Sequence, residues 1–268
     1  MTTNYIGQPQ DRVDGRAKVT GMAKYAAEYN VPDLTYGYVI SSGIARGKII
    51  DIDASVALAL PGVLQVFTHE NTPNLAWFDR SYRDTVAPPG SPFRPLSDEN
   101  ILYSGQPVAL VVADTFELAR YAATLVRIQY EREAHATDLE KRRAEAYTPT
   151  ERKGIELAPA PRGNVEHALA AATTRIEVEY RVPIEHHNPM EPFATTVSWG
   201  DDGTMTVYEK TQGVQNNHAY VRKVFALSAE EVRVVSPFVG GAFGSGLRPQ
   251  YQLFLAVLAA RELIAACK

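Results

Sequence analysis

The chain has 268 residues, of which 45% are apolar and 22% charged, and its formal net charge is −4. A chain of this length can bury one large or two modest hydrophobic cores, and we expect two domains. The acidic balance, without a basic stripe, argues against binding to nucleic acid or to an anionic membrane surface. The polar amino terminus lacks a secretory signal, and no stretch reaches the ~20 apolar residues of a membrane span. A cytoplasmic protein without membrane insertion is therefore expected.

The first 135 residues alternate short strand patterns with short helix patterns. Residues 14–21 predict a turn, and residues 71–98, which carry five prolines, predict a long surface loop. Asp114 is the expected N-cap of the second helix. Strands are predicted at 34–42, 48–53, 63–68, 108–113 and 126–130, the first two paired with each other, and helices at 55–60 and 115–125. The mixture predicts an α+β domain containing a βαβ unit.

The second half begins after a charged stretch. Residues 131–161 predict an interdomain linker with room for one helical turn. Gly163-Asn164 is expected to cap a helix that ends at Ala172, and Ser228 and Glu231 have capping-box spacing. Further strands are predicted at 174–182, 195–199, 205–209 and 231–236, with the second and third forming a hairpin, and helices at 216–225 and 251–266.

A glycine-rich segment, Gly240-Gly-Ala-Phe-Gly-Ser-Gly246, separates the last strand from the last helix; we call it the glycine loop. Glycines permit positive φ and close backbone approach, so successive amides can bind an oxyanion, a phosphate or an oxo group. A nucleotide P-loop would need Gly-Lys-Ser or Gly-Lys-Thr where Leu247-Arg248 follows, and a dinucleotide fingerprint would need a third glycine at Pro249. A tight structural turn remains the alternative.

Other candidate residues favour structural roles. His186 and His187 are adjacent in an extended, proline-bounded stretch, so their side chains point to opposite faces and no metal site is expected. Glu191 in Met-Glu-Pro is expected to be a buried, hydrogen-bonded carboxylate and not a general base. Cys267 is the single cysteine, which excludes an internal disulfide and a cysteine-ligated cluster, and it is expected to lie in a helix.

Four motifs in order carry a resemblance. Residues 14–25, Met190-Glu191-Pro192, Gln212-Gly213 and the glycine loop together resemble the molybdenum-binding subunit of the xanthine dehydrogenase and aldehyde oxidase family. The resemblance implies an α+β fold with an a/b hammerhead-like domain at 11–135, a linker at 136–162 and the incomplete first part of a molybdenum cofactor-binding domain at 163–268. Asn164 replaces the family's usual aspartate and still caps well.

The resemblance also implies chemistry. In the family the matching glutamine contacts an oxygen on molybdenum and the glycine loop contacts the cofactor, so the implied cofactor-binding residues are Gln212, Gly213, Gly241, Ala242, Phe243 and Gly244. Molybdenum is held there by the pterin dithiolene, so no protein metal ligand is implied. The cofactor is molybdenum–molybdopterin, with the cytosine dinucleotide form left open. The family's catalytic glutamate lies in a later glycine-rich motif that no residue here matches, so no catalytic residue is assigned and the isolated chain is expected to be inactive.

The implied reaction is oxidation of an aldehyde or aromatic heterocycle with water as the oxygen source. Electrons would pass to iron–sulfur and FAD subunits of a heteromeric complex, and a partner subunit would carry the chain if it were exported. Gly246-Leu247-Arg248 stands where purine-oxidising relatives have lysine and glutamate, which favours aldehydes over xanthine. The alternatives are a catalytically inactive fragment or assembly module without cofactor, and a nucleotide-binding protein.

The last predicted helix, at 251–266, is apolar nearly all round and calls for cover on several sides. Because nothing after Lys268 supplies that cover, we expect the chain to be the amino-terminal portion of a longer subunit.

Overall fold

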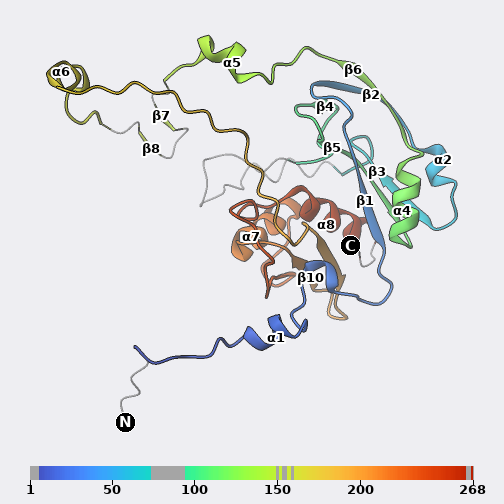
Figure 1. Ribbon diagram of the computed structural model, residues 1–268. Coiled ribbons are helices and arrows are strands. Elements are labelled where there is room, and N and C mark those ends of the chain that lie inside the picture. The colour runs from blue at the N-terminus through green and yellow to red at the C-terminus, as the bar shows by residue number, and fades with distance from the viewer. Residues whose placement is uncertain are drawn as a thin grey trace.

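The computed structural model describes residues 6–73, 94–148, 151–152, 156–157, 160–263 and 267. The described chain builds a body of three three-stranded sheets packed with helices, from which an amino-terminal segment and a long arm project (Figure 1). The amino-terminal segment carries the helix α1 (Gly15–Val19), where the sequence predicted a turn, and the 3-10 turn η1 (Ala26–Glu28). The mixture of helices with separate sheets confirms the α+β class.

The first sheet has the order β1 (Tyr36–Ser41), β5 (Pro107–Ala113), β3 (Val63–Phe67), with both neighbours antiparallel to β5. All seven β5 residues are buried because both faces of the sheet are covered. Ala109 and Val111 pack with the helices α2 (Ser55–Leu58) and α4 (Phe116–Ala123), whereas Leu110 and Val112 join the core of the second half of the chain. Successive side chains of β5 point to opposite faces of the sheet, so this one strand contributes to both hydrophobic cores.

The second sheet places β2 (Gly47–Asp53) between β4 (Asn100–Ile101) and β6 (Arg127–Arg132). Two predictions are therefore wrong: β1 pairs with β5 and not with β2, and β5 and β6, which flank α4, lie in different sheets and form no βαβ unit. Periodicity identifies strands but does not choose their partners. The N-cap of α4 is Thr115, whose hydroxyl accepts from the Leu118 amide at 3.2 Å, and not Asp114.

The third sheet belongs to the second half. A hairpin joins β9 (Thr195–Trp199) to β10 (Met205–Glu209), and β11 (Val232–Val235) runs parallel to β10 on its other side. The helix α7 (Val214–Phe225) connects the two parallel strands, so the chain does contain a βαβ unit, at a place the sequence reading did not anticipate. The capping-box pair Ser228 and Glu231 bonds reciprocally in the turn before β11.

The helix α8 (Tyr251–Leu263) is the centre of the molecule. Its residues 253–260 are all buried, at 7% exposure or less, because β9, β1 and β5 pack around it together with Phe225 of α7. Part of the cover that the apolar pattern calls for is therefore supplied by earlier segments of this chain, since β9 and the first sheet pack against α8. Residues 264–266 of the predicted helix lie outside the described residues, and Cys267 is no helix residue but bridges Thr35 and Val197.

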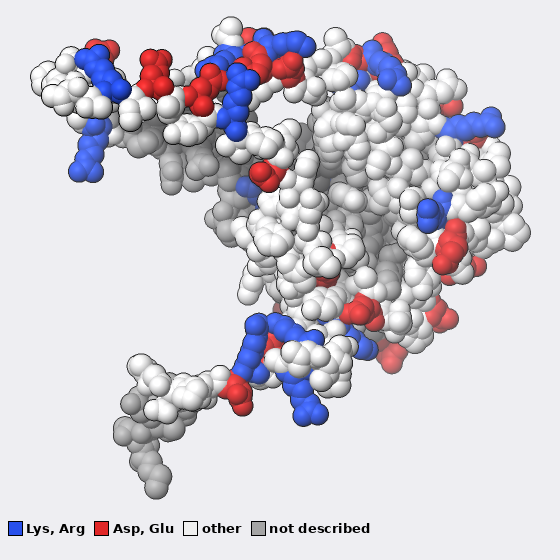
Figure 2. Space-filling view, viewed as in Figure 1, with Lys and Arg blue, Asp and Glu red and all other residues white. Residues whose placement is uncertain are grey.

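The arm contains the short helices α5 (Leu139–Arg142) and α6 (Val165–Ala171), the 3-10 turn η2 (Arg143–Glu145) and the ladder of β7 (Glu151–Arg152) with β8 (Glu156–Leu157). Asn164 caps α6 as predicted, accepting from the His167 amide at 2.9 Å. Every residue in 131–148 and 160–188 is exposed, and Figure 2 shows charges of both signs interspersed along the arm.

The strand predicted at 174–182 is wrong. Its backbone is extended, but it pairs with no described strand, and Ile176, Val178 and Tyr180 are 83%, 58% and 85% exposed. A strand requires a neighbour as well as a pattern, and the described chain offers none here. Within the loop predicted at 71–98, residues 74–93 lie outside the described residues.

Candidate functional site

The connection from β10 to α7 carries the predicted glutamine. Gln212 follows the strand end, and Gly213 is the residue before the first turn of α7. The Thr211 hydroxyl organises this bend, because it accepts from the Gly213 amide at 2.9 Å and donates to the carbonyl of Gly246 at 3.1 Å. The side chain of Gln212 is exposed and forms no hydrogen bond with a described residue. Its amide group is therefore free to bind a ligand.

The glycine loop connects β11 to α8 and lies against Gln212. The backbone amide of Gln212 donates to the carbonyl of Gly246 at 2.8 Å, so the end of the loop is fixed to the bend that carries Gln212. The loop also bends on itself, since the amide of Ser245 donates to the carbonyl of Ala242 at 2.9 Å. The structure thus brings together the sequence-predicted residues Gln212, Gly213, Gly241, Ala242, Phe243 and Gly244.

Glycine is required at several of these positions. A Cβ on Gly240 would lie 2.6 Å from the Cβ of Glu191, and one on Gly213 would lie 3.0 Å from the carbonyl oxygen of Leu247. Gly241, Phe243 and Gly244 have φ of 90°, 53° and 93°. A phenylalanine in this left-handed region is uncommon, and strained backbone of this kind clusters at active sites and ligand-binding loops. Its ring is 71% exposed.

The loop presents unused hydrogen-bond donors. The amides of Gly241, Ala242, Phe243 and Gly244 donate to no acceptor among the described residues. Consecutive free amides in left-handed turns form a concave site for an oxygen-rich or anionic group. Together with the free side-chain amide of Gln212, these backbone amides provide hydrogen-bond donors and one acceptor but no titratable side chain. The arrangement can bind and orient such a group, and it supplies no general base.

Buried ionisable residues lie just before this site. Glu209, at the end of β10, is 1% exposed, and burial raises its pKa to about 8. Its carboxyl accepts from the Thr195 hydroxyl and, at 3.1 Å, from the Gln252 amide. Lys210 is also 1% exposed; its Nζ donates to the carbonyl of Glu191 and lies 3.9 Å from the Phe193 ring centroid. Burial lowers the pKa of Lys210, and the Glu191 charge partly offsets that change.

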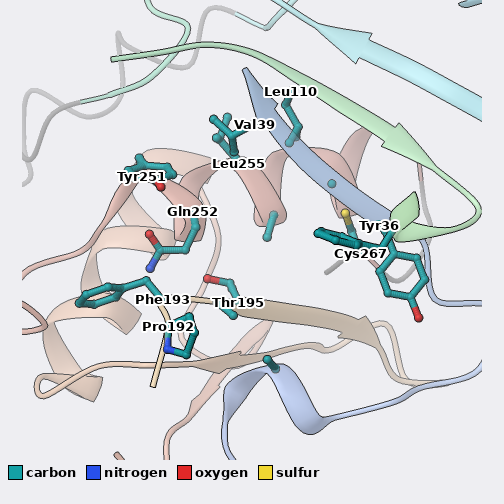
Figure 3. A pocket seen from close by; sticks show the side chains of 15 residues that line it. Tyr36, Val39, Leu110, Pro192, Phe193, Thr195, Tyr251, Gln252, Leu255 and Cys267 are labelled. Carbon is teal, nitrogen blue, oxygen red and sulfur yellow. The ribbon is translucent and has the colours of Figure 1, made fainter. Parts of the chain in front are cut away.

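A cavity of about 550 Å³ lies beside these groups, between the first sheet, α8 and the approach to β9 (Figure 3). Val39 and Leu110 of the first sheet face Phe193 and Gln252 across it. Thr195 and Gln252, the two partners of Glu209, form its polar corner, and the described residues that line it include no Asp, Glu, Lys or Arg. The cavity therefore suits apolar groups.

The expected structural carboxylate Glu191 is half-buried and hydrogen-bonded to the glycine loop, with its Oε2 accepting from the Gly240 amide at 2.7 Å. His186 and His187 are exposed in the arm. In the described ranges there is no group of three or more His, Cys, Asp or Glu residues that could hold a metal ion. None of the helices among the described residues has the length and apolar character to cross a membrane.

Comparison with known proteins identifies both halves of the chain. Residues 20–134 match the sequence model of the aldehyde oxidase and xanthine dehydrogenase a/b hammerhead domain, and residues 147–268 match that of the molybdopterin cofactor-binding domain. The chain belongs to the aldehyde oxidase and xanthine dehydrogenase family. Members of this family are molybdopterin-dependent oxidoreductases, and the order of the two domains agrees with the predicted one.

Individual relatives of the family agree. The chain is 34% identical over 260 residues to the aldehyde oxidoreductase molybdenum-binding subunit PaoC of Escherichia coli strain K12, covering 96% of this chain and 34% of the relative. It is 27% identical to the nicotinate dehydrogenase large molybdopterin subunit of Eubacterium barkeri, covering 94% of this chain and 58% of the relative. The structure of reconstituted CO dehydrogenase from Oligotropha carboxidovorans matches with a TM-score of 0.75 at 25% identity, covering 97% of this chain and 34% of that one. The chain thus spans about a third of the first of these relatives and of the CO dehydrogenase chain.

Sequence reasoning missed the buried groups beside the loop. Glu209 is the last residue of β10 and Lys210 follows it, at a strand end where charged residues normally reach solvent. A charged pair directly before Thr211-Gln212-Gly213 was the available signal, but its burial depends on Phe193 and Gln252 from other segments.

Proposed function

We propose that the chain forms part of the molybdenum-cofactor site of a hydroxylase that oxidises an aldehyde or an aromatic heterocycle with water as the oxygen source. The observation that carries the proposal is the set of four free amides, Gly241 to Gly244, next to the free side chain of Gln212. Membership of a molybdopterin-dependent family supports molybdopterin as the bound group.

The residues present fit such a group. Gly240 lies tightly against the Glu191 side chain and Gly213 against the backbone of Leu247. The loop leaves the amides of residues 241–244 unpaired, as a cradle for phosphate or oxo oxygens requires. When bound, the cofactor supplies the two-electron redox chemistry at molybdenum, which the side chains of this chain do not provide. We propose Gln212, Gly213, Gly241, Ala242, Phe243 and Gly244 as its contacts in this chain.

The chain's own residues perform binding and orientation. The Gln212 amide can donate to one oxygen and accept from a neighbouring donor, so it fixes the orientation of the group against the loop amides. The exposed ring of Phe243, held in the left-handed region, covers part of the loop and can exclude water from the bound group. The glycine loop, with its free amides and no ionisable side chain, favours oxygen atoms over a protein-ligated metal.

The substrate and partners follow from the same proposal. Aldehydes are favoured over xanthine because Leu247-Arg248 follows the loop in place of lysine and glutamate. Electrons would leave to iron–sulfur and FAD subunits in a cytoplasmic complex, with the cofactor as molybdopterin or its cytosine dinucleotide. PaoC is named as a subunit of an aldehyde oxidoreductase, which supports a multi-subunit assembly. We keep the boundaries 11–135, 136–162 and 163–268 as part of this proposal.

A second candidate is an assembly module without cofactor. The exposed arm favours it, because Ile176, Val178 and Tyr180 form an apolar row along one face of an extended segment. Such a row is typical of a surface that packs against another polypeptide. This function would need no ligand at the glycine loop.

One experiment separates the two candidates. The chain is produced in cells that make the molybdenum cofactor, and the molybdenum and pterin retained after purification are measured for the wild type, Gln212→Ala and the matched control Gln215→Ala. Gln215 is exposed on α7 three residues further along. We expect about tenfold less cofactor in Gln212→Ala and no change in the control, as for loss of one hydrogen bond to a charged group. Equal retention in all three proteins contradicts the assigned role of Gln212, and an empty wild type supports the assembly module.

A further inference from the structure

Glu191 contacts the start of the glycine loop through two groups. Its backbone amide donates to the carbonyl of Gly240 at 3.1 Å, and its side-chain Oε2 accepts from the amide of Gly240 at 2.7 Å. Both backbone polar groups of Gly240 are therefore bonded to a single residue. The two residues also pack closely, since a Cβ on Gly240 would lie 2.6 Å from that of Glu191.

The same residue is tied to the bend that carries Gln212. The carbonyl of Glu191 accepts from Nζ of Lys210, a residue that lies two positions before Gln212. The Lys210 side chain is buried against the ring of Phe193. Gln212 in turn bonds the far end of the loop through the carbonyl of Gly246. The loop is thus held at its start by Glu191 and at its end by Gln212, and Lys210 connects the two attachments.

The free amides lie between these two attachments. Gly241 to Gly244 have no acceptor among the described residues, whereas the flanking amides of Gly240 and Ser245 are both bonded. If the Gly240 attachment were lost, the loop could rotate and pair its amides with water or its own carbonyls. A fixed Gly240 keeps the donors in a conformation that a ligand can use at once.

We propose that Glu191 is the positioning residue of the glycine loop. It holds Gly240 through the length and acceptor oxygen of its side chain, so that the amides of Gly241 to Gly244 remain available. The identity of the group they bind rests on the proposed function, but the attachment itself does not. Its second oxygen, Oε1, is buried without a partner in the described structure, so the role depends on Oε2 and not on a second hydrogen bond.

Two substitutions separate length from charge. Glu191→Gln keeps the length and an acceptor for the Gly240 amide but removes the charge. Glu191→Asp keeps the charge, but its carboxylate is one methylene too short to reach that amide. Glu185→Gln is the matched control, because Glu185 is exposed in the same extended segment. If Glu191 acted only through its charge, Glu191→Gln would disturb the loop more than Glu191→Asp. If it acted only through packing, both substitutions would disturb the loop equally.

The primary measurement is amide hydrogen exchange at Gly240 in the full chain without cofactor, read by NMR. We expect exchange about tenfold or more faster in Glu191→Asp, from loss of a hydrogen bond to a charged group, and rates within about threefold of the wild type in Glu191→Gln and the control. Thermal unfolding of each protein checks that the fold is retained. Wild-type protection in Glu191→Asp, or loss of protection in Glu191→Gln, overturns the proposal.

Cofactor retention in the same four proteins gives a second reading. We expect Glu191→Asp to lose molybdenum and pterin about tenfold while Glu191→Gln retains them. If the exchange pattern is as expected but no protein, including the wild type, retains pterin, the proposed function fails and the positioning role of Glu191 stands. If the wild type does retain pterin and Glu191→Asp retains as much, the loop does not depend on this attachment and the proposal is overturned.

Discussion

Replacing Glu209 with glutamine should remove a large pH dependence of stability. Burial raises the pKa of this carboxyl to about 8, from an ordinary value of 4.5, and its hydrogen bonds to Thr195 and Gln252 only partly counteract burial. Between pH 4.5 and 8 the folded chain therefore holds a proton at Glu209 that the unfolded chain has released. Because the folded state binds more protons, the free energy of unfolding falls as pH rises through this window.

The magnitude follows from the size of the window. Each pH unit inside it costs about 1.4 kcal/mol, so raising the pH from about 5.5 to about 8.5 should destabilise the wild type by roughly 3 kcal/mol through this group. The stabilisation from the protonated Glu209 carboxyl is complete below the pKa of the unfolded chain and is lost as the pH rises through the pKa of the folded chain. Glutamine has a similar volume, keeps an acceptor and an amide, and does not titrate, so Glu209→Gln should lack this loss.

The assay is urea unfolding of the wild type, Glu209→Gln and Glu230→Gln at the two pH values. Glu230 is exposed, and its substitution serves as the control for a change of charge alone. The stability difference between the wild type and Glu209→Gln should change by roughly 3 kcal/mol in favour of the variant at the higher pH. A difference that stays constant with pH refutes the reasoning and means that Glu209 is already ionised in the folded chain at low pH.

Three further changes test the core, a helix cap and the glycine loop. Leu258→Ala, at a fully buried position of α8, should lower the free energy of unfolding by about 2–5 kcal/mol in urea, and a loss below about 1 kcal/mol would contradict the central place of this helix. Thr115→Ala should cost about 1 kcal/mol because the α4 cap is lost, whereas Asp114→Ala should cost less, and the reverse order in urea unfolding would contradict the observed cap. Gly240→Ala places a Cβ 2.6 Å from that of Glu191 and should lower pterin retention about tenfold, whereas Gly43→Ala, where nothing lies within 4 Å, should leave it unchanged; equal retention in both would exclude a tight loop.

Local sequence signals predicted the elements around the site well. The alternation at 195–199 and 205–209 gave the hairpin of β9 and β10, and the valine-rich run before the glycine loop gave β11. Gln212 was expected after a strand end, and it lies there. These features depend on residues close in sequence, namely side-chain alternation and glycine's access to positive φ, so a single sequence contains enough information to predict them.

Long-range pairing could not be predicted in the same way. The pattern at 174–182 matches a strand as well as β9 does, but no described neighbour pairs with it. Cys267 was predicted in a helix but instead pairs with the backbone of Val197. The Val197 amide donates to the Cys267 carbonyl at 2.7 Å, and the Cys267 amide donates to the Val197 carbonyl at 3.0 Å. Part of the cover on α8 comes from the first sheet, which lies far earlier in the sequence. Each outcome depends on which segments meet in space, and composition does not encode that.

The burial of Glu209 and Lys210 likewise depends on long-range contacts. Charged residues are normally exposed, and only contacts with Thr195, Phe193 and Gln252 bring these groups inside. The sequence therefore predicted the loop, its glutamine and a hydrogen-bonded carboxylate at Glu191, but not the partner of that carboxylate or the buried pair Glu209 and Lys210. The positioning of the site depends on tertiary contacts, whereas its donors come from the backbone.

The most direct test of the account is the pterin content of the wild-type chain, measured together with molybdenum after purification from cells that make the cofactor. If the four free amides and Gln212 form a cofactor cradle, the purified chain retains pterin and molybdenum in equal amounts. A folded chain that carries neither, although the same cells load another molybdenum enzyme, would contradict the central claim.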